Sequence, residues 1–261
     1  MEPMRTAAAA DDAAANVSAV NLDPLFPPPR PKRRLYIMRH GLKETNTLDR
    51  LNYDLQLLPE GKDALQVLRA FLDAHDINFG RVLCSPFARC RQTSSALTDD
   101  FELEPGLSEV LSDRHGLRDG SGGGSLDTLV ERIDADMTLA IEQRRDDCGL
   151  PLIKASELLR DENVTTFLQC MARSFELTER LLHRSELFDR GPVLLVTHGA
   201  TSFGLIEALT TRALPVWDSS RTPEMGSITQ LEEEADGTWR AIGNVVPFRA
   251  KSGRWTCQWT Q

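Results

Sequence analysis

The stretch Leu35-Tyr36-Ile37-Met38-Arg39-His40-Gly41 decides the fold, because an apolar run ends abruptly in a cation, an imidazole and a glycine. Four β-compatible residues bounded by Arg34 and Gly41 predict a strand that is buried on both faces. Such strands are typical of open α/β sheets, in which ligands bind at the carboxyl ends of the strands. The pattern therefore places Arg39 and His40 at a ligand-binding edge of a sheet.

Two later segments repeat this design. The stretch Val193-Leu194-Leu195-Val196-Thr197-His198-Gly199 places a second histidine before a glycine at a strand end, and the run Ala200–Leu209 predicts the helix that follows. Between the two histidines, Arg81-Val82-Leu83-Cys84-Ser85 predicts a short strand, with Pro86 as the first residue of the next helix and Arg89 in its first turn. Two histidines and two arginines at three strand ends favour a pocket for phosphate, because Arg binds phosphate in a bidentate fork.

With these residues in place, the chain resembles the histidine phosphatase superfamily, also called the phosphoglycerate mutase-like family. The resemblance spans about residues 33–246. It rests on segments whose order and spacing match the family: Arg39-His40-Gly41, Asn46, the run Asp54–Gly61, Ser85-Pro86-Phe87-Ala88-Arg89 with Gln92-Thr93, and His198-Gly199. We therefore expect an α/β fold, a three-layer α/β/α sandwich with a mostly parallel central sheet.

The resemblance implies hydrolysis of a phosphomonoester through a phosphohistidine. His40 would attack phosphorus, and the phosphoryl oxygens would be held by a set of donors: Arg39, Lys43, Asn46, Arg89 and a protonated His198. No metal or other cofactor is expected, because fixed cations supply the charge neutralisation and the sequence offers no Asp/His cluster with metal-ligand spacing. The expected partner is a phosphorylated small molecule or a phosphoprotein.

The proton donor is expected between the second arginine and the second histidine. The segment Leu103–Val110 offers two candidates, Glu104 and Glu109. Glu109 matches the family's Leu-x-Glu pattern and would act as general acid and then as general base, whereas Glu104 is expected to be a solvated residue before a turn. The Glu-Pro-Gly-Leu-x-Glu pattern resembles the eukaryotic branch that contains the ubiquitin-associated and SH3-domain phosphatases. His115, in the following loop, is a further candidate for lining the pocket.

Departures from the family leave alternatives open. Leu42 and Lys43 stand where the family commonly has Glu or Gln and then Thr or Ser, and the missing hydroxyl argues against a phosphoglycerate mutase. A mutase remains the alternative within the same chemistry, and a catalytically silent scaffold that binds phosphorylated ligands remains the alternative from another class. A cysteine-dependent phosphatase does not fit, because the sixth residue after Cys84 is Cys90 rather than an arginine; Cys84 is expected to be a buried strand residue.

The composition is that of a protein with one sizeable core. The 261 residues are 41% hydrophobic and carry a net charge of −9, so binding to nucleic acid is not expected. Five cysteines without a Cys-x-x-Cys pair argue against a disulfide framework and favour the cytoplasm, with the nucleus as a further option. No apolar run approaches a membrane span, and no signal peptide is expected in the Ala-rich start.

The chain divides into a disordered tail, residues 1–32, and a phosphatase domain, residues 33–261. The tail ends in a Pro-rich segment followed by Lys32-Arg33-Arg34, which suits a stiff linker, a polyproline ligand or a weak nuclear-localisation patch. Helical periodicity is expected in four later segments: Glu60–His75 around Leu65, Leu68 and Leu72, Phe87–Leu97, Leu126–Arg144 and Asn163–Leu187. The final strands are expected at Ser227–Glu232 and Thr238–Asn244 around an Asp236-Gly237 turn, with Trp255 and Trp259 packing on the body.

Overall fold

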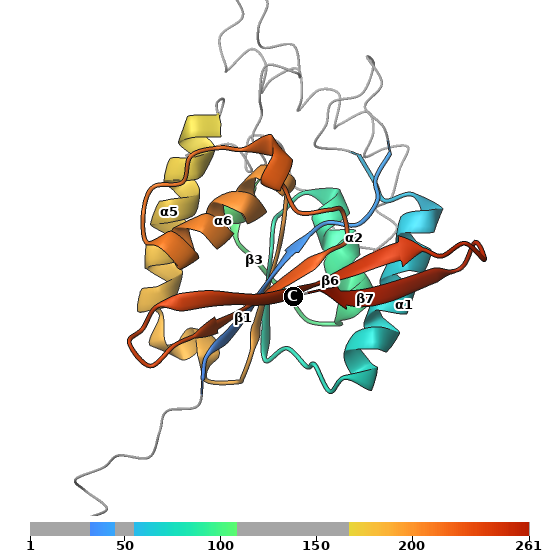
Figure 1. The fold of residues 1–261 in the computed structure, drawn as a ribbon, viewed down its shortest axis with the longest axis horizontal. Coiled ribbons are helices and arrows are strands. Elements are labelled where there is room, and N and C mark those ends of the chain that lie inside the picture. Colours follow the sequence, from blue (N-terminus) through green and yellow to red (C-terminus); the bar gives the residue numbers. More distant parts are fainter. Residues whose placement is uncertain (1–31, 45–54, 109–166, 261) are drawn as a thin grey trace, which may run out of the picture. The chain divides into compact units, whose positions relative to one another are not determined.

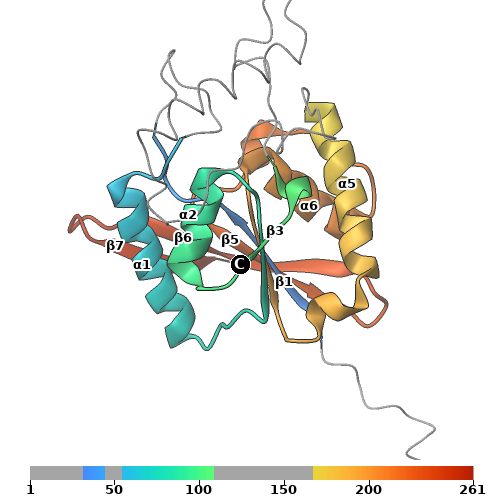
Figure 2. The same cartoon turned by 180° about the vertical axis from the view of Figure 1, so that it is seen from behind.

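The computed structural model describes residues 32–44, 55–108 and 167–260. In these residues helices flank a seven-stranded sheet (Figures 1 and 2). The strands are β1 (Arg34–Arg39), β2 (Arg81–Cys84), β3 (Glu102–Leu103), β4 (Val193–Thr197), β5 (Ile228–Glu233), β6 (Trp239–Arg249) and β7 (Trp255–Thr260). The helices are α1 (Pro59–Ala74), α2 (Ala88–Leu97), α5 (Phe167–His183) and α6 (Gly199–Thr211), with short 3₁₀ turns η3 (Pro105–Leu107), η5 (Ser185–Phe188) and η6 (Ser219–Arg221).

The central sheet is mostly parallel, as expected from the sequence. Its strand order is β3-β2-β4-β1-β5-β6-β7. The strands β3, β2, β4 and β1 pair in parallel, whereas β5, β6 and β7 add on in antiparallel steps. Two antiparallel steps return β6 to the direction of β1, so only β5 and β7 run the other way. The α/β fold class is thereby confirmed.

The alternation of side chains along the strands builds two separate cores. Tyr36 and Met38 point to the face that α1 and α2 cover, where they join Leu65 and Leu68. Leu35 and Ile37 point to the opposite face and pack with residues of α5 and α6. Because strands buried on both faces must be apolar at every position, the unbroken hydrophobic run of β1 follows from this three-layer arrangement, which Figures 1 and 2 show from opposite sides.

Most predicted elements within the described residues are confirmed, with differences at their ends. The helix α2 begins at Ala88, because Phe87 still has an extended backbone, so Pro86 precedes the helix instead of opening it. The predicted helix to Leu187 ends earlier, at His183, and continues as η5. Among the described helices, none combines the length and the apolar character that a membrane crossing needs.

The C-terminal strands extend further than the sequence pattern indicates. β6 continues to Arg249, and a turn at Gly253, whose φ is +79°, leads into β7, a strand that was not predicted. Trp259 is partly buried and packs against the core cluster that contains Leu65 and Leu68 of α1, so the expected packing on the body is present. The Asp236-Gly237 turn is present, with the Asp236 carboxylate accepting hydrogen bonds from the backbone and hydroxyl of Thr238.

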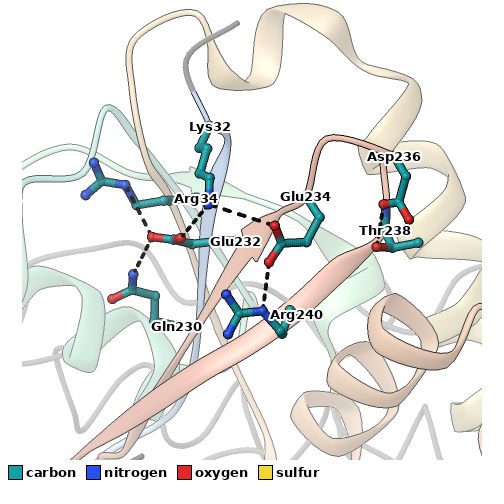
Figure 3. A network of polar contacts seen from close by, with 8 residues as sticks. All are labelled: Lys32, Arg34, Gln230, Glu232, Glu234, Asp236, Thr238 and Arg240. Atoms are coloured by element: carbon teal, nitrogen blue, oxygen red, sulfur yellow. Dashed lines mark hydrogen bonds and ion pairs between the residues drawn. The ribbon is translucent and has the colours of Figure 1, made fainter. Parts of the chain in front are cut away.

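A network of charges holds the start of β1 to β5 (Figure 3). The antiparallel register places Arg34 opposite Glu232, and the Lys32 ammonium lies 3.7 Å from Glu232 and 3.9 Å from Glu234. Arg33 forms a bidentate pair with Glu233. Exposed pairs of this kind contribute about 0–1 kcal/mol each, so their main effect is on strand register. The basic run that suits a nuclear-localisation patch thus has acidic partners in the folded domain.

We predict that Leu195→Ala will lower the free energy of unfolding by about 2–5 kcal/mol, because Leu195 lies at the centre of β4 and is fully buried. The matched control is Val216→Ala, which truncates a side chain that is 86% exposed and should change stability by less than about 0.5 kcal/mol. Urea unfolding of both variants measures the difference. Equal effects would contradict the assignment of β4 to the core.

Candidate active site

The register of β1 and β4 brings the two predicted histidines together. Arg39 lies opposite Thr197 in the parallel pairing, so the next residues along each strand, His40 and His198, are neighbours at the carboxyl edge of the sheet. The His40 backbone N–H donates to the Thr197 carbonyl at 2.9 Å. The two imidazoles are buried, with ring centroids 5.5 Å apart and planes inclined by 63°.

The contacts of His40 indicate its tautomer. Its Nδ1 lies 2.8 Å from the Gly41 carbonyl oxygen. Since a carbonyl can only accept a hydrogen bond, Nδ1 carries the hydrogen. In the neutral ring the lone pair is therefore on Nε2, the nitrogen that a nucleophile needs.

His198 has the opposite tautomer. The Arg89 Nη2 lies 3.1 Å from His198 Nδ1, and a guanidinium can only donate. Nδ1 therefore accepts, and in the neutral ring Nε2 carries the hydrogen and donates to Ser85 Oγ at 2.8 Å. The Phe87 ring packs edge-on against the His198 ring, with centroids 4.9 Å apart. Arg89 and Ser85 thus hold His198 as a neutral imidazole in this arrangement, and the protonated His198 that would bind a phosphoryl group stays a prediction.

Burial and neighbouring cations keep both imidazoles neutral. Burial lowers the pKa of His40 well below its usual range, and the positive charge of Arg89 lowers it further. The hydrogen bond to the Gly41 carbonyl raises the pKa but does not offset these two effects. Burial and Arg89 likewise lower the pKa of His198. Each imidazole lacks a positive charge because it is buried and because it lies among positive charges.

Arg39 reaches the same edge from the other face of the sheet. Its Nη1 donates to the Pro223 carbonyl at 2.8 Å, and the Gly226 N–H donates back to the carbonyls of Arg39 and His40 at 3.1 and 2.9 Å. A Cβ on Gly199 would lie 3.1 Å from the Arg39 Cζ. The connection before β5 and the first residue of α6 therefore fix this guanidinium, and sequence reasoning identified only Gly199 of this set.

Arg89 is the second residue of α2, and its side chain is fully buried. Thr93, one turn later, accepts a hydrogen bond from the Gly41 N–H at 3.0 Å and donates to the Arg89 carbonyl at 2.7 Å. Gln92 accepts from the Leu57 N–H at 2.8 Å. The polar run after Arg89 thus ties α2 to the loop that follows His40. Two helices, α2 and α6, begin at this edge, and helix N-termini favour bound anions.

The chain before the predicted acid is anchored beside the second histidine. Thr201 in α6 donates to the Ser108 carbonyl at 2.9 Å, Arg173 in α5 donates to the same oxygen, and Thr197 donates to the Leu107 carbonyl at 2.6 Å. Arg173 is buried, and its charge helps to lower the pKa of His198. Sequence reasoning missed Arg173; an Arg within the apolar period of α5 was the available signal.

The remaining predicted site residues have different outcomes. Asn46, Glu109 and His115 lie outside the described residues. The charge of Lys43 lowers the pKa of His40, so this ammonium acts on the site from the loop after β1. Glu104 lies before the turn as expected and is partly exposed, and its carboxylate also caps η3 by accepting from the Gly106 N–H at 3.0 Å and pairs with Arg180. In residues 32–44, 55–108 and 167–260, no three His, Cys, Asp or Glu side chains form a group suited to a metal ion.

Comparison with known proteins agrees with this geometry. The profile of the histidine phosphatase superfamily (branch 1) matches residues 35–244, and the chain belongs to this superfamily. Its members act as phosphatases or mutases through a phosphohistidine. A 6-phosphofructo-2-kinase/fructose-2,6-bisphosphatase from Caenorhabditis elegans is 35% identical over 89 residues, which are 31% of this chain and 20% of that protein.

Solved structures share the fold. The mycobacterial glucosyl-3-phosphoglycerate phosphatase superposes with a TM-score of 0.53 at 23% identity, covering 81% of this chain and 98% of its own. YhfR of Bacillus stearothermophilus superposes with a TM-score of 0.50 at 20% identity, covering 80% and 95%. These likenesses establish the phosphoglycerate mutase-like arrangement of sheet and helices.

We predict that Gly199→Ala will weaken binding of tungstate by about tenfold or more, the equivalent of one charged hydrogen bond of about 1.5–3 kcal/mol. The added Cβ would collide with Thr222 at 2.8 Å and crowd Arg39, which must shift. Since Ala favours helix over Gly by about 1 kcal/mol, α6 itself should not suffer. Calorimetric titration measures the affinity, and a thermal melt checks the fold. Unchanged affinity would contradict the role of Gly199 in placing Arg39.

Proposed function

We propose that this protein hydrolyses phosphomonoesters through a phosphohistidine on His40. The observation that carries the proposal is the hydrogen bond from His40 Nδ1 to the Gly41 carbonyl, which leaves Nε2 with its lone pair beside a cluster of cations. A neutral imidazole of fixed tautomer is a competent nucleophile. The tautomer, the burial and the flanking arginines together support this role better than a role in simple ligand binding.

The first half-reaction transfers the phosphoryl group. His40 Nε2 forms a bond to phosphorus while the bond from phosphorus to the leaving oxygen breaks. Arg39 and Arg89 approach the edge from opposite faces of the sheet, so they can bind different oxygens of one phosphoryl group. Lys43 adds a third positive charge, and Asn46 is proposed as a further donor. Fixed donors of this kind stabilise the charge that develops in the transition state.

The reaction is proposed to need no metal ion. Three side chains, Arg39, Arg89 and Lys43, supply positive charge where a divalent cation would otherwise act. The N-termini of α2 and α6 add partial positive charge at the same edge of the sheet. The net charge of the whole chain is −9, so these local cations work against the overall field. The phosphoenzyme should accordingly form in the presence of EDTA.

Glu109 is proposed as the proton donor. Its neighbour in the sequence, Ser108, supports this choice, because the Ser108 carbonyl accepts a hydrogen bond from Thr201 of the helix that follows His198. Glu104, the other candidate, has its carboxylate engaged with Gly106 and Arg180. Glu109 would protonate the leaving alkoxide or phenoxide and then accept a proton from the water that attacks phosphohistidine. Free phosphate and neutral His40 would result.

The residues after His40-Gly41 favour hydrolysis over mutase chemistry. Leu42 and Lys43 occupy the places where a mutase would need a hydroxyl to position a sugar acid. The Glu104–Glu109 pattern supports a relationship to the eukaryotic branch with the ubiquitin-associated and SH3-domain phosphatases.

The proposed substrates are phosphorylated small molecules or phosphoproteins, and the proposed location is the cytoplasm. Turnover of p-nitrophenyl phosphate separates the enzyme from a silent scaffold.

We predict that rapid quench with labelled substrate in EDTA will trap an acid-labile, base-stable phosphoenzyme, and that His40→Ala will abolish it. The reason is that a phosphorus–nitrogen bond to imidazole survives base but not acid. His183→Ala, which removes an exposed histidine at the end of α5, is the matched control and should leave the label intact. Label that persists in His40→Ala would place the nucleophile elsewhere, and formation that needs added Mg²⁺ would refute the metal-free site.

We predict that Glu109→Gln will reduce turnover of alkyl phosphates by about 10²-fold or more. Its effect on turnover of p-nitrophenyl phosphate should be smaller. An alkoxide needs a proton to leave, whereas p-nitrophenolate does not. Glu104→Gln is the matched control, because its carboxylate caps η3 and should show no dependence on the leaving group. Steady-state kinetics with both substrates test this, and equal losses in Glu109→Gln would exclude it as the acid.

A further inference from the structure

Both ring nitrogens of His198 have protein partners. Arg89 donates to Nδ1 at 3.1 Å, and Nε2 faces Ser85 Oγ at 2.8 Å. A neutral ring held in this way has no hydrogen on Nδ1 and cannot donate from that atom to an oxyanion. If His198 is to stabilise a phosphoryl group, the contact with Arg89 must change.

We propose that an oxyanion entering the site draws Arg89 away from His198 Nδ1, and that Nδ1 then takes up a proton from solvent. The guanidinium exchanges a neutral acceptor for a doubly charged one, which is the stronger hydrogen bond. The vacated Nδ1 gains the hydrogen that it lacked and becomes a donor toward the anion. No covalent bond of the ligand breaks in this step, and the balance is one anion and one proton bound.

The groups around His198 explain why the proton arrives only with the anion. On α2 these are Arg89 and Cys90, whose Sγ lies 3.5 Å from Nε2; from the other elements come His40 and Arg39 of the β1 end and Arg173 of α5. The charged members of this described set are cations. They oppose a further positive charge on the ring until a dianion offsets them.

Ser85 is the positioning residue for this exchange. Its backbone N–H donates to the Val196 carbonyl at 2.9 Å, which continues the pairing of β2 with β4 and fixes the hydroxyl beside Nε2. Nε2 carries a hydrogen in the neutral tautomer and also in the imidazolium, so its bond to Ser85 is compatible with both states. Ser85 can therefore hold the ring in place while Nδ1 changes partner.

The inference rests on the oxyanion pocket of the proposed function but not on hydrolysis. Because the complex holds one proton more than the free protein, oxyanion affinity should rise as pH falls toward neutrality and decline as pH rises through the pKa of His198 in the complex. Sulfate is the suitable probe, since it stays doubly charged in this range and any proton taken up must go to the protein.

Isothermal titration of sulfate in two buffers of different ionisation enthalpy measures the linkage. We expect uptake of about one proton per sulfate near neutral pH in the wild-type protein, retention of this uptake in His40→Asn, and its loss in His198→Asn. Absence of uptake, uptake that persists in His198→Asn, or no binding of sulfate at all would each overturn the inference. Sulfate binding with uptake in a protein that fails to turn over p-nitrophenyl phosphate would preserve it and defeat the hydrolase assignment.

Ser85 is tested in the same assay. Ser85→Ala should reduce both sulfate affinity and proton uptake, and Ser85→Thr, which keeps a hydroxyl, should restore uptake. Ser94→Ala is the matched control. Ser94 lies in α2 and is as deeply buried as Ser85, but within the described residues it has no contact with His198. Equal linkage in Ser85→Ala and Ser94→Ala would remove Ser85 from the exchange.

Discussion

The parallel register between β1 and β4 is the constraint on which the rest of the site depends. Arg39 opposite Thr197 makes His40 and His198 neighbours, and a slip of one residue would turn one imidazole to the opposite face of the sheet. The register is set by apolar side chains that must point alternately to two helical layers. The packing of the core and the placement of the two histidines therefore have a single cause, which is the pleat of two buried strands.

Electrostatics gives the second level of organisation. Arg89 is completely buried, and a buried cation costs free energy unless polar groups or charges compensate it. A neutral imidazole, His198, accepts one of the hydrogen bonds that Arg89 donates, and His40 is also neutral. The arrangement is suited to a doubly charged ligand, since the cations are already dehydrated and oriented before it arrives. The dehydrated state of Arg89 and the lowered pKa values of both histidines are consequences of the same burial.

Segments far from the strand ends in the sequence hold Arg39 and the carbonyl of Ser108 in place. The backbone around Pro223 and Gly226 holds Arg39 from the strand side, and Arg173 with Thr201 holds the carbonyl of Ser108 from the helix side. These contacts join parts of the chain more than sixty residues apart, as the sequence separations show. The backbone groups among them, such as the Pro223 carbonyl and the Gly226 amide, leave no trace in the pattern of residue types, so no sequence motif indicates them.

The sequence by itself determined the fold class and the three strand ends, because buried strands need apolar runs, and it put two arginines and two histidines at those ends. Helix α1 was also predictable, since the period of 3.6 residues in its apolar positions is a local property. Only the tertiary structure decided that His198 is neutral, that Glu104 is a cap, and that Ser85 and Arg173 contact the site. Protonation and hydrogen-bond partners depend on which groups surround a side chain in space, and that is set by the packing of segments far apart in the chain.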